Sequence, residues 1–380
     1  MSENSVLIIA GEASGDLHGS ALIDELKTLS PDLKLFGIGG HKMRSSGLEL
    51  IFHSDDLNFM GFVEVIKHIP YIKKIQKKII EEVINRKTKY AILIDYPGFN
   101  LSLAKKLKNL NVKILYFISP QIWAWGHSRI KKIKKLISKM FVLFPFEEEF
   151  YKKFGVEAEY VGHPLITILN NYKFLDKSEL FEKFNLDKSK EILLLLPGSR
   201  KHEVSLILPS ILPAAEKLSK LHNMQIVIAC SNSIEEDFIR SSANSNSYKI
   251  ISGYNYDLMK HSKFGIIKSG TSTLEAGLLG LPMIIVYKAN YLSYLIGMLL
   301  IKVKYIGIVN ILSGEQIVPE LLQTKLTEKN ILSIVNNLLS DPQKIELMKQ
   351  GLSNLSQKLG SKNSAKITAK KIIDFINEEA

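Results

Sequence analysis

The stretch AGEASGDLHG, residues 10 to 19, places acidic and hydroxyl side chains directly after the apolar residues 6 to 9. Its glycines recur every fourth residue, which is neither the G-x-G-x-x-G spacing of a dinucleotide site nor a P-loop. Glu12 and Asp16 would repel a phosphate there, so the stretch suits sugar hydroxyls, with Ser14, Gly15 and Asp16 as candidate ligands. The alternative is a plain strand-to-helix turn with Asp16 in the first helical turn.

A second carboxylate, Asp95, follows the apolar run from Tyr90 to Ile94. Side chains at the carboxyl ends of parallel strands line the ligand crevice of an open α/β sheet, so Asp95 could act there as a general base. Alternatively, Asp95 caps the helix expected near Leu101 or forms an Asx-turn with Pro97 and Gly98.

Anion chemistry is concentrated in the second half of the chain. The run from Ile192 to Leu196 leads into Pro197, Gly198, Ser199 and Arg200, just before a helical segment that begins near Glu203. A tight turn with a hydroxyl, an arginine and free amides at a helix start binds anions, and Arg200 would hold a diphosphate bidentately. A surface turn with a solvated arginine is the alternative.

A comparable junction spans residues 264 to 275. Here Ser269, Gly270 and Thr271 would face phosphates, and Glu275 would receive ribose hydroxyls. Ser272 and Glu275 also fit a capping box, which would make the same residues structural.

The only two tryptophans lie in one loop, residues 119 to 125. Trp123 and Trp125, with Gln121, could form the wall of a site for an apolar ligand, although aromatic side chains more commonly fill a core. His163 could be an acid/base group, but a buried, hydrogen-bonded histidine is the favoured interpretation.

The elements that position these residues alternate between short apolar strands and longer helices, which is typical of βαβ units and a parallel sheet. We expect strands at 6–10, 34–38, 90–94, 113–118 and 140–144, and again at 192–196, 225–229, 249–252, 264–268 and 283–287. Helices are expected at 20–29, 101–110 and 365–377. The fold class is therefore α/β, with two Rossmann-like domains.

The expected N-terminal domain spans residues 1–168, and a C-terminal helix within 355–380 completes it. The expected C-terminal domain spans residues 185–354.

Composition narrows the class of protein further. The chain has 380 residues, 46% of them hydrophobic, which is enough for two cores. Cys230 is the single cysteine, so we expect a reducing compartment and no disulfide. No signal peptide is recognisable, and the longest uncharged apolar stretch, 289–301, is too short to cross a bilayer. We expect a soluble or peripheral protein.

The net charge of +12 favours anionic partners. Between residues 61 and 84 lysines alternate with isoleucines at helical spacing. An interfacial helix needs such a cationic face over an apolar stripe, so we expect Ile72, Ile75, Ile79, Lys73, Lys74 and Lys77 to face a membrane. Alternatively, the isoleucines pack on their own sheet. Lysine-rich helices would also suit a nucleic-acid-binding protein, but no nucleic acid is expected as a partner.

Seven segments in one order resemble the lipid-A-disaccharide synthase family of inverting glycosyltransferases. They are residues 10–16, 94–100, 119–125, 162–164, 196–200, 269–275 and 310–323. The resemblance spans nearly the whole chain. It implies a GT-B-type architecture, two Rossmann-like domains facing each other across a cleft, with a UDP-linked acylated sugar as donor and an acylated sugar phosphate as acceptor.

By this resemblance Asp95 corresponds to the family's essential aspartate, and Glu12 is another candidate base. Arg200 corresponds to the arginine that contacts UDP. The resemblance makes residues 185–354 the donor domain, with a donor site of Ser199, Arg200, Ser269, Gly270, Thr271, Glu275, Asn310 and Gln316. It makes residues 1–168 the domain that faces the acceptor and the membrane, and we assign to the acceptor Ser14, Gly15, Asp16, Gln121, Trp123 and Trp125. No cofactor is expected, and no metal, since no Asp-x-Asp pair occurs. The implied setting is the inner face of the cytoplasmic membrane, on an anionic surface, and a homodimer is plausible.

Two other enzyme classes could share such a fold. A UDP-sugar epimerase would use the same nucleotide but needs no lipid-facing surface. A nicotinamide oxidoreductase would need the missing glycine fingerprint.

Overall fold

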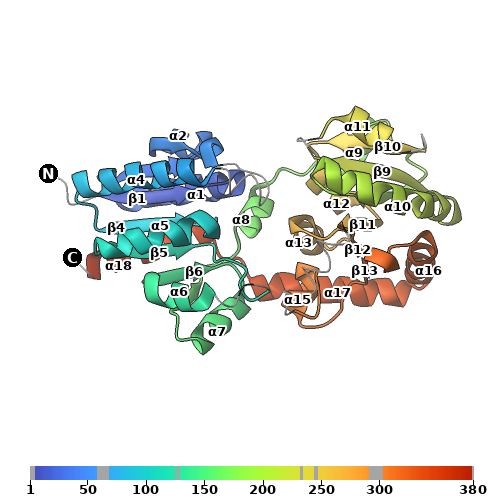
Figure 1. The fold of residues 1–380 in the computed structure, drawn as a ribbon. Coiled ribbons are helices and arrows are strands. Elements are labelled where there is room, and N and C mark those ends of the chain that lie inside the picture. Colours follow the sequence, from blue (N-terminus) through green and yellow to red (C-terminus); the bar gives the residue numbers. More distant parts are fainter. Residues whose placement is uncertain are drawn as a thin grey trace. The chain divides into compact units, whose positions relative to one another are not determined.

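The computed structural model describes residues 5–57, 68–124, 126, 129–231, 234–243, 247–290 and 303–378. Within it the chain forms two compact units, each with its own sheet (Figure 1). Unit 1 is Met1–Asn171 with Leu359–Ala380, and unit 2 is Tyr172–Lys358.

Unit 1 is built on a seven-stranded sheet in which every described pair of strands is parallel. In spatial order the strands are β3 (Glu49–His53), β2 (Lys34–Gly39), β1 (Ser5–Ala10), β4 (Tyr90–Ile94), β5 (Lys113–Phe117), β6 (Lys139–Val142) and β7 (Ala158–Tyr160). The central strands β1 and β4 are buried at every position, as expected for a parallel sheet covered on both faces. The strand order reverses direction between β1 and β4, which is where ligands bind in open α/β sheets.

Helices cover both faces of this sheet. One face carries α4 (Ile69–Asn85), α5 (Pro97–Asn109), α6 (Ile130–Leu136) and α7 (Pro145–Lys153). The other carries α1 (Ala13–Leu29), α2 (His41–Ser45) and the C-terminal α18 (Ser364–Glu378). The remaining elements are η1 (Ser54–Leu57) and α8 (Pro164–Asn171).

Helix α1 begins at Ala13, seven residues before the expected start, because two glycines of the first stretch are helical. A Cβ on Gly15 would lie 3.2 Å from the Cβ of Ala10, and one on Gly19 would lie 2.6 Å from the sulfur of Met43. These glycines therefore let α1 pack closely on the sheet. This packing gives Gly15 a structural role, and its assignment to the acceptor site stays a prediction.

The isoleucine stripe of α4 faces the sheet, and the prediction that it faces a membrane is wrong for Ile75 and Ile79. Both side chains are 0% exposed in the core of unit 1, and Ile72 packs against the same core. Lys73, Lys74 and Lys77 remain exposed on the opposite face. The helical period that marks an interfacial helix also marks a helix lying on its own sheet, and here the sheet supplies the apolar partner.

Unit 2 repeats the architecture with a six-stranded parallel sheet. In spatial order its strands are β10 (Tyr248–Ser252), β9 (Met224–Cys230), β8 (Glu191–Leu196), β11 (Phe264–Lys268), β12 (Met283–Tyr287) and β13 (Glu320–Leu322). Its order reverses between β8 and β11. Its helical segments are α9 (Lys177–Lys183), α10 (Lys201–Leu221), α11 (Glu236–Ser241), α12 (Asn255–His261), α13 (Thr271–Leu278), α15 (Ile308–Ser313), η3 (Gln323–Lys325), α16 (Glu328–Leu339) and α17 (Pro342–Leu359).

The predicted strands are present in both sheets, and three further strands, β3, β7 and β13, were not predicted. All three lie at sheet edges, are only three to five residues long and are largely half-buried, so any apolar run in them is at most three residues long. Both units have the α/β architecture with a parallel sheet that the alternation of strands and helices predicts.

The C-terminal α18 belongs to unit 1 although the preceding helix, α17, belongs almost wholly to unit 2. It packs alongside α1 at the other end of the sequence (Figure 1). Among the described helices, none is both long enough and apolar enough to span a bilayer.

Candidate functional site

Two carboxylates lie at the carboxyl ends of the strands where the order of sheet 1 reverses. The register pairs Ala10 of β1 with Ile94 of β4, so Glu12 and Asp95 follow neighbouring strand ends. Glu12 is exposed and is the N-cap residue of α1, although its side chain makes no capping hydrogen bond. The structure therefore brings the two candidate bases to one edge of unit 1.

Asp95 has a backbone φ of +44° and Tyr96 one of +46°, and both values lie in the left-handed region that non-glycine residues rarely occupy. Buried hydrogen bonds hold this turn. Asn100 Nδ2 donates to the carbonyl of Ile94 at 3.1 Å and to that of Asp95 at 2.7 Å, and the Tyr116 hydroxyl also donates to the Asp95 carbonyl. Sequence analysis assigned Asn100 no role, since a short-range polar contact inside a turn has no spacing signature.

The environment of Asp95 raises the pKa of its carboxyl to about 6. Burial is the larger cause, the negative charge of Glu12 adds to it, and a hydrogen bond from the Tyr96 backbone opposes it. A carboxylate with such a pKa is still ionised at pH 7 and is a stronger base than an ordinary aspartate. Asp95 neither caps α5, which begins at Pro97 with Tyr96 as N-cap, nor lies in a conventional right-handed turn.

The residues predicted to bind the acceptor differ in how accessible their side chains are. Ser14 is exposed on the first turn of α1. Asp16 is 7% exposed, and its carboxylate accepts backbone N–H groups of Gly40 (2.7 Å), Lys42 (3.1 Å) and Met43 (3.0 Å). Asp16 therefore stabilises the start of α2, and its oxygens are already engaged.

Trp123 lies in the interior, and Gln121 is exposed. The Trp123 ring packs edge-on against Phe146 with centroids 5.0 Å apart, and the side chain is 7% exposed. This agrees better with a core aromatic than with the wall of a ligand site. Trp125 lies outside the described residues.

A buried glutamate that sequence analysis missed holds this loop. Glu147 is 2% exposed, and one carboxylate oxygen accepts from Ser119 Oγ at 2.5 Å and Trp123 Nε1 at 3.0 Å. The other oxygen accepts the backbone N–H groups of Leu143 (3.1 Å) and Phe144 (2.9 Å). Burial raises its pKa to about 7, although these four donors stabilise the ionised form.

His163 has the buried environment favoured from the sequence. It is 8% exposed, its Nδ1 accepts the backbone N–H of Leu165 at 3.2 Å, and its ring lies 5.2 Å from that of Phe144. Burial, aided by the nearby His18, lowers its pKa to about 4, so the imidazole is neutral at pH 7.

In unit 2 the two predicted phosphate turns are neighbours, because β8 and β11 pair where the strand order reverses. Arg200 is exposed and is the N-cap residue of α10, and Ser199 precedes it. At the other turn Gly270 is the N-cap of α13, Thr271 begins the helix, and Ser269 is buried.

The start of α13 excludes the predicted capping box. Gly270, not Ser272, is the N-cap, and no side chain caps the helix. Glu275 instead lies within 3.5 Å of the Tyr256 hydroxyl, and burial raises its pKa despite that hydrogen bond. Its carboxylate is therefore free of the structural role that the capping box would give it.

Asn310, which the resemblance assigns to the donor site, is buried and hydrogen-bonded within the fold. It is 0% exposed. Its Nδ2 donates to the Val318 carbonyl (2.8 Å) and to Glu320 (2.7 Å), while its Oδ1 accepts the N–H groups of Ile317 (2.9 Å) and Val318 (3.0 Å). The carboxamide has no exposed atom left to offer to a ligand.

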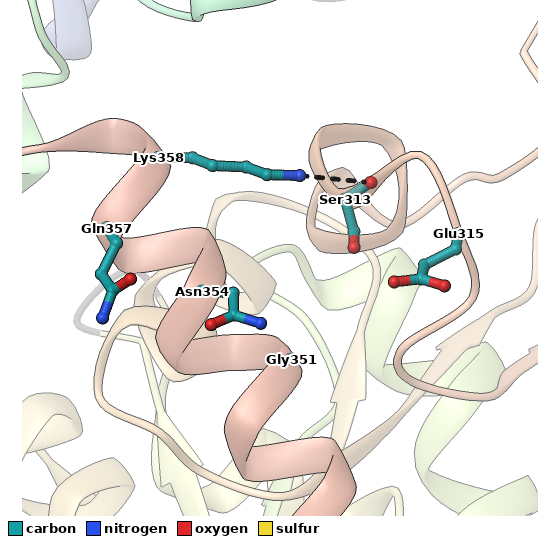
Figure 2. Close-up of a pocket in the computed structure, with 6 residues that line it drawn as sticks. All are labelled: Ser313, Glu315, Gly351, Asn354, Gln357 and Lys358. Atoms are coloured by element: carbon teal, nitrogen blue, oxygen red, sulfur yellow. Dashed lines mark hydrogen bonds between the residues drawn. The ribbon is translucent and has the colours of Figure 1, made fainter.

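Gln316 is exposed on the loop between α15 and β13, next to the hollow shown in Figure 2. Glu315 faces α17 across this hollow, where Asn354 and Lys358 point toward the loop. The loop precedes β13, whereas Ser199, Arg200 and Ser269 follow β8 and β11. No contact links Gln316 to these turns among the described residues, and its assignment to the donor site stays a prediction.

Among the described residues, no three histidine, cysteine, aspartate or glutamate side chains gather in a way that could hold a metal ion. The groups available for chemistry are the carboxylates of unit 1 and the cations and helix starts of unit 2.

Residues 6–373 match the family model described as lipid-A-disaccharide synthetase. The chain is 38% identical to lipid-A-disaccharide synthase of Geobacter metallireducens over 98% of each chain. It is 37% identical to that of Myxococcus xanthus over 98% of this chain and 97% of the relative.

Solved structures with the same fold are more distant in sequence. A UDP-GlcNAc 2-epimerase from Neisseria meningitidis aligns with a TM-score of 0.65 at 14% identity, covering 97% of this chain and 100% of its own. A calicheamicin glycosyltransferase aligns with a TM-score of 0.63 at 12% identity over the whole of both chains. These similarities show the fold, a GT-B-type pair of parallel-sheet units.

Proposed function

Because the chain belongs to the lipid-A-disaccharide synthase family, we propose that it transfers 2,3-diacylglucosamine from UDP to 2,3-diacylglucosamine 1-phosphate with inversion. The products are lipid A disaccharide 1-phosphate and UDP. The observation that carries this function is the pair of carboxylates, Glu12 and Asp95, at the reversal point of sheet 1, with the pKa of Asp95 raised to about 6.

In this proposal Asp95 is the general base. It takes the proton of the acceptor hydroxyl while that oxygen attacks the anomeric carbon of the donor sugar, and the bond from that carbon to the diphosphate breaks. Glu12 contributes negative charge that keeps Asp95 basic. It is the second candidate for the same proton transfer.

Unit 2 would bind the donor. Arg200 supplies a guanidinium suited to two phosphate oxygens, and the starts of α10 and α13 supply the positive ends of two helix dipoles. These groups favour the negative charge that develops on departing UDP. Glu275, which is not engaged in a capping box, is the proposed acceptor of ribose hydroxyls.

Purified protein incubated with the two diacylated sugars tests the proposal. We expect stoichiometric release of UDP and a disaccharide 1-phosphate detectable by mass spectrometry. Arg200→Ala should weaken UDP binding, and Asp95→Ala should abolish turnover while UDP still binds. Release of an isomerised monosaccharide, or no disaccharide from the wild type, would refute the glycosyltransferase assignment.

We also propose that the protein acts at the cytoplasmic face of the membrane, with the exposed side of α4 on the anionic surface. Lys73, Lys74 and Lys77 are exposed there, and Ile69 and Tyr71 at the start of α4 are 42% and 37% exposed. Lysines close to an anionic surface each contribute roughly 1 kcal/mol of binding.

Co-sedimentation with phosphatidylglycerol-containing vesicles tests the membrane proposal. Replacing Lys73, Lys74 and Lys77 by Gln should weaken binding by about a hundredfold if each contributes on that scale. The matched control replaces Lys105, Lys106 and Lys108, which are exposed on α5. Equal loss in both triple variants would mean that general charge, not α4, governs binding. We also propose a homodimer. Static light scattering of the protein as it elutes from a size-exclusion column measures its mass and tests this proposal.

A further inference from the structure

Lys268 is the last residue of β11 and lies beside the proposed donor site. Its side chain is 19% exposed, and its ammonium lies 2.8 Å from Oε1 of Glu203 in the first turn of α10. Residues that end β11 and follow β8 meet at the reversal point of sheet 2, because Ile267 pairs with Leu196. Lys268 is thus a second cation beside the proposed diphosphate site.

Glu203 holds both the lysine and the phosphate turn. Its other oxygen, Oε2, accepts the backbone N–H of Ser199 at 3.1 Å. Burial alone would raise the pKa of Glu203, but the hydrogen bond and charge of Lys268 and the Ser199 N–H outweigh it, and the pKa is lowered. The carboxylate therefore remains ionised and fixes the lysine.

One glycine leaves the space that Glu203 needs, and a second glycine lies beside the lysine. Gly198 has a φ of +137°, and a Cβ there would lie 2.7 Å from the Cβ and Oε2 of Glu203. A Cβ on Gly270 would lie 3.9 Å from the ammonium of Lys268. The ammonium is therefore close to the start of α13 while its partner Glu203 contacts the turn before α10.

We propose that Lys268 is a direct ligand of the donor's diphosphate, and that Glu203 positions it between the two phosphate turns. The inference rests on the proposed function, and it adds a second cation, besides Arg200, to the proposed diphosphate site. An ammonium has three donors, so Lys268 can keep its bond to Glu203 and still donate to phosphate oxygens. A diphosphate carries more than one negative charge, which a single guanidinium would leave partly unpaired.

Calorimetric titration of the full-length protein with UDP, UMP and uridine tests this inference. Lys268→Met should weaken UDP binding by about tenfold to a hundredfold, the usual effect of losing a hydrogen bond to a charged group. The loss should be smaller for UMP and absent for uridine. Lys220→Met, at the exposed far end of α10, is the matched control.

Removing Lys268 alone leaves the Glu203 carboxylate without its cation, which could distort the turn. A second comparison therefore uses Glu203→Gln as the parent and adds Lys268→Met to it. Neither of these two proteins carries the carboxylate charge at position 203. The double variant should lose UDP affinity by a similar factor relative to Glu203→Gln.

The outcomes separate the inference from the function on which it rests. UDP affinity within twofold of the matched parent in both comparisons would overturn the role of Lys268 while leaving the UDP site intact. An equal loss for uridine would show that Lys268 only supports the fold, which also overturns it. A wild-type protein that does not bind UDP would refute the proposed function itself.

Discussion

At the scale of single residues, the chemistry of unit 1 depends on backbone conformations that cost free energy. Asp95, Tyr96 and Ile118 follow the ends of β4 and β5 with φ values of +44°, +46° and +64°. Such conformations persist only where surrounding contacts enforce them, and they concentrate at functional sites. Here the side chain of Asn100 and backbone hydrogen bonds from the N–H groups of Asp95 and Ile118 enforce them.

The pKa of Asp95 predicts how activity depends on pH. A general base must be ionised, so kcat/KM should rise with pH up to about 6 and then level off. Asp95→Asn should reduce kcat by about a thousandfold, within the usual range for general base catalysis. Initial rates from pH 4.5 to 8 measure both effects, and a profile that is flat across pH 5 to 7 would contradict the assignment.

The same pKa predicts a gain in stability when the charge is removed. The carboxyl of Asp95 titrates at about 6 in the folded protein and ordinarily at 3.8, so the folded state loses stability as pH rises through this window. At pH 7 Asp95→Asn should therefore raise the melting temperature, as a thermal unfolding scan would record. At pH 3, where both states are protonated, the difference should vanish.

Replacing Glu147 should destabilise the loop of residues 119 to 124 in unit 1. Its two oxygens each accept two hydrogen bonds, and an amide nitrogen in place of either oxygen would face two donors. Glu147→Gln should lower the free energy of unfolding by about 2 to 3 kcal/mol, measured by urea denaturation. The control is Glu149→Gln on the exposed face of the same helix, which should change it little.

At the scale of elements, α4 shows that one amphipathic pattern can serve two surfaces. Its apolar side, with Ile75 and Ile79, completes the core over the sheet, and its lysines face outward. The helix can therefore present only its charged side and its first turn to a membrane. Helix α1 makes a similar point, since glycines that suggested a ligand loop serve close helix packing.

Substitution in α4 distinguishes core from interface. Ile75→Ser should destabilise unit 1 by about 3 to 4 kcal/mol, because it removes buried methyl groups and buries a hydroxyl. Ile84→Ser, at a position 55% exposed on the same helix, should be tolerated. Chemical denaturation measures both, and a stable Ile75→Ser protein with weaker vesicle binding would instead favour the membrane role of the stripe.

At the scale of the whole molecule, the two units are joined by two stretches of chain, near residues 171 and 358. The second delivers α18 to unit 1, where Ala369 and Ile372 are 0% exposed in the core beside α1. Unit 1 is thus closed by the last helix of the sequence.

Truncation after Lys358 should therefore affect the units unequally. Loss of α18 removes Ala369 and Ile372 from the core cluster that also contains Ile92, Leu115 and Phe141, so unit 1 should unfold at a lower temperature. Unit 2 lies between the two connecting stretches of chain and should keep its affinity for UDP. Hydrogen exchange resolved by peptide can record each unit separately, and a uniform rise in exchange across both units would contradict this division.

The sequence by itself determined the alternation of buried strands and helices, and with it the parallel sheets and the strand-end positions of Glu12, Asp95 and Arg200. These follow from local apolar runs and turn residues, which the chain encodes over a few positions. The ordered motifs also sufficed to indicate the family.

Only the tertiary structure decided which side chains were already engaged. The side chains of Asn310 and Asp16 form their hydrogen bonds within the fold, and Ile75 faces the sheet. Glu147 and the Glu203–Lys268 pair connect separate elements. Such contacts join residues 7 to 65 positions apart or depend on which face of a helix meets a sheet. Local patterns do not contain that information, because the partner is supplied by another part of the chain.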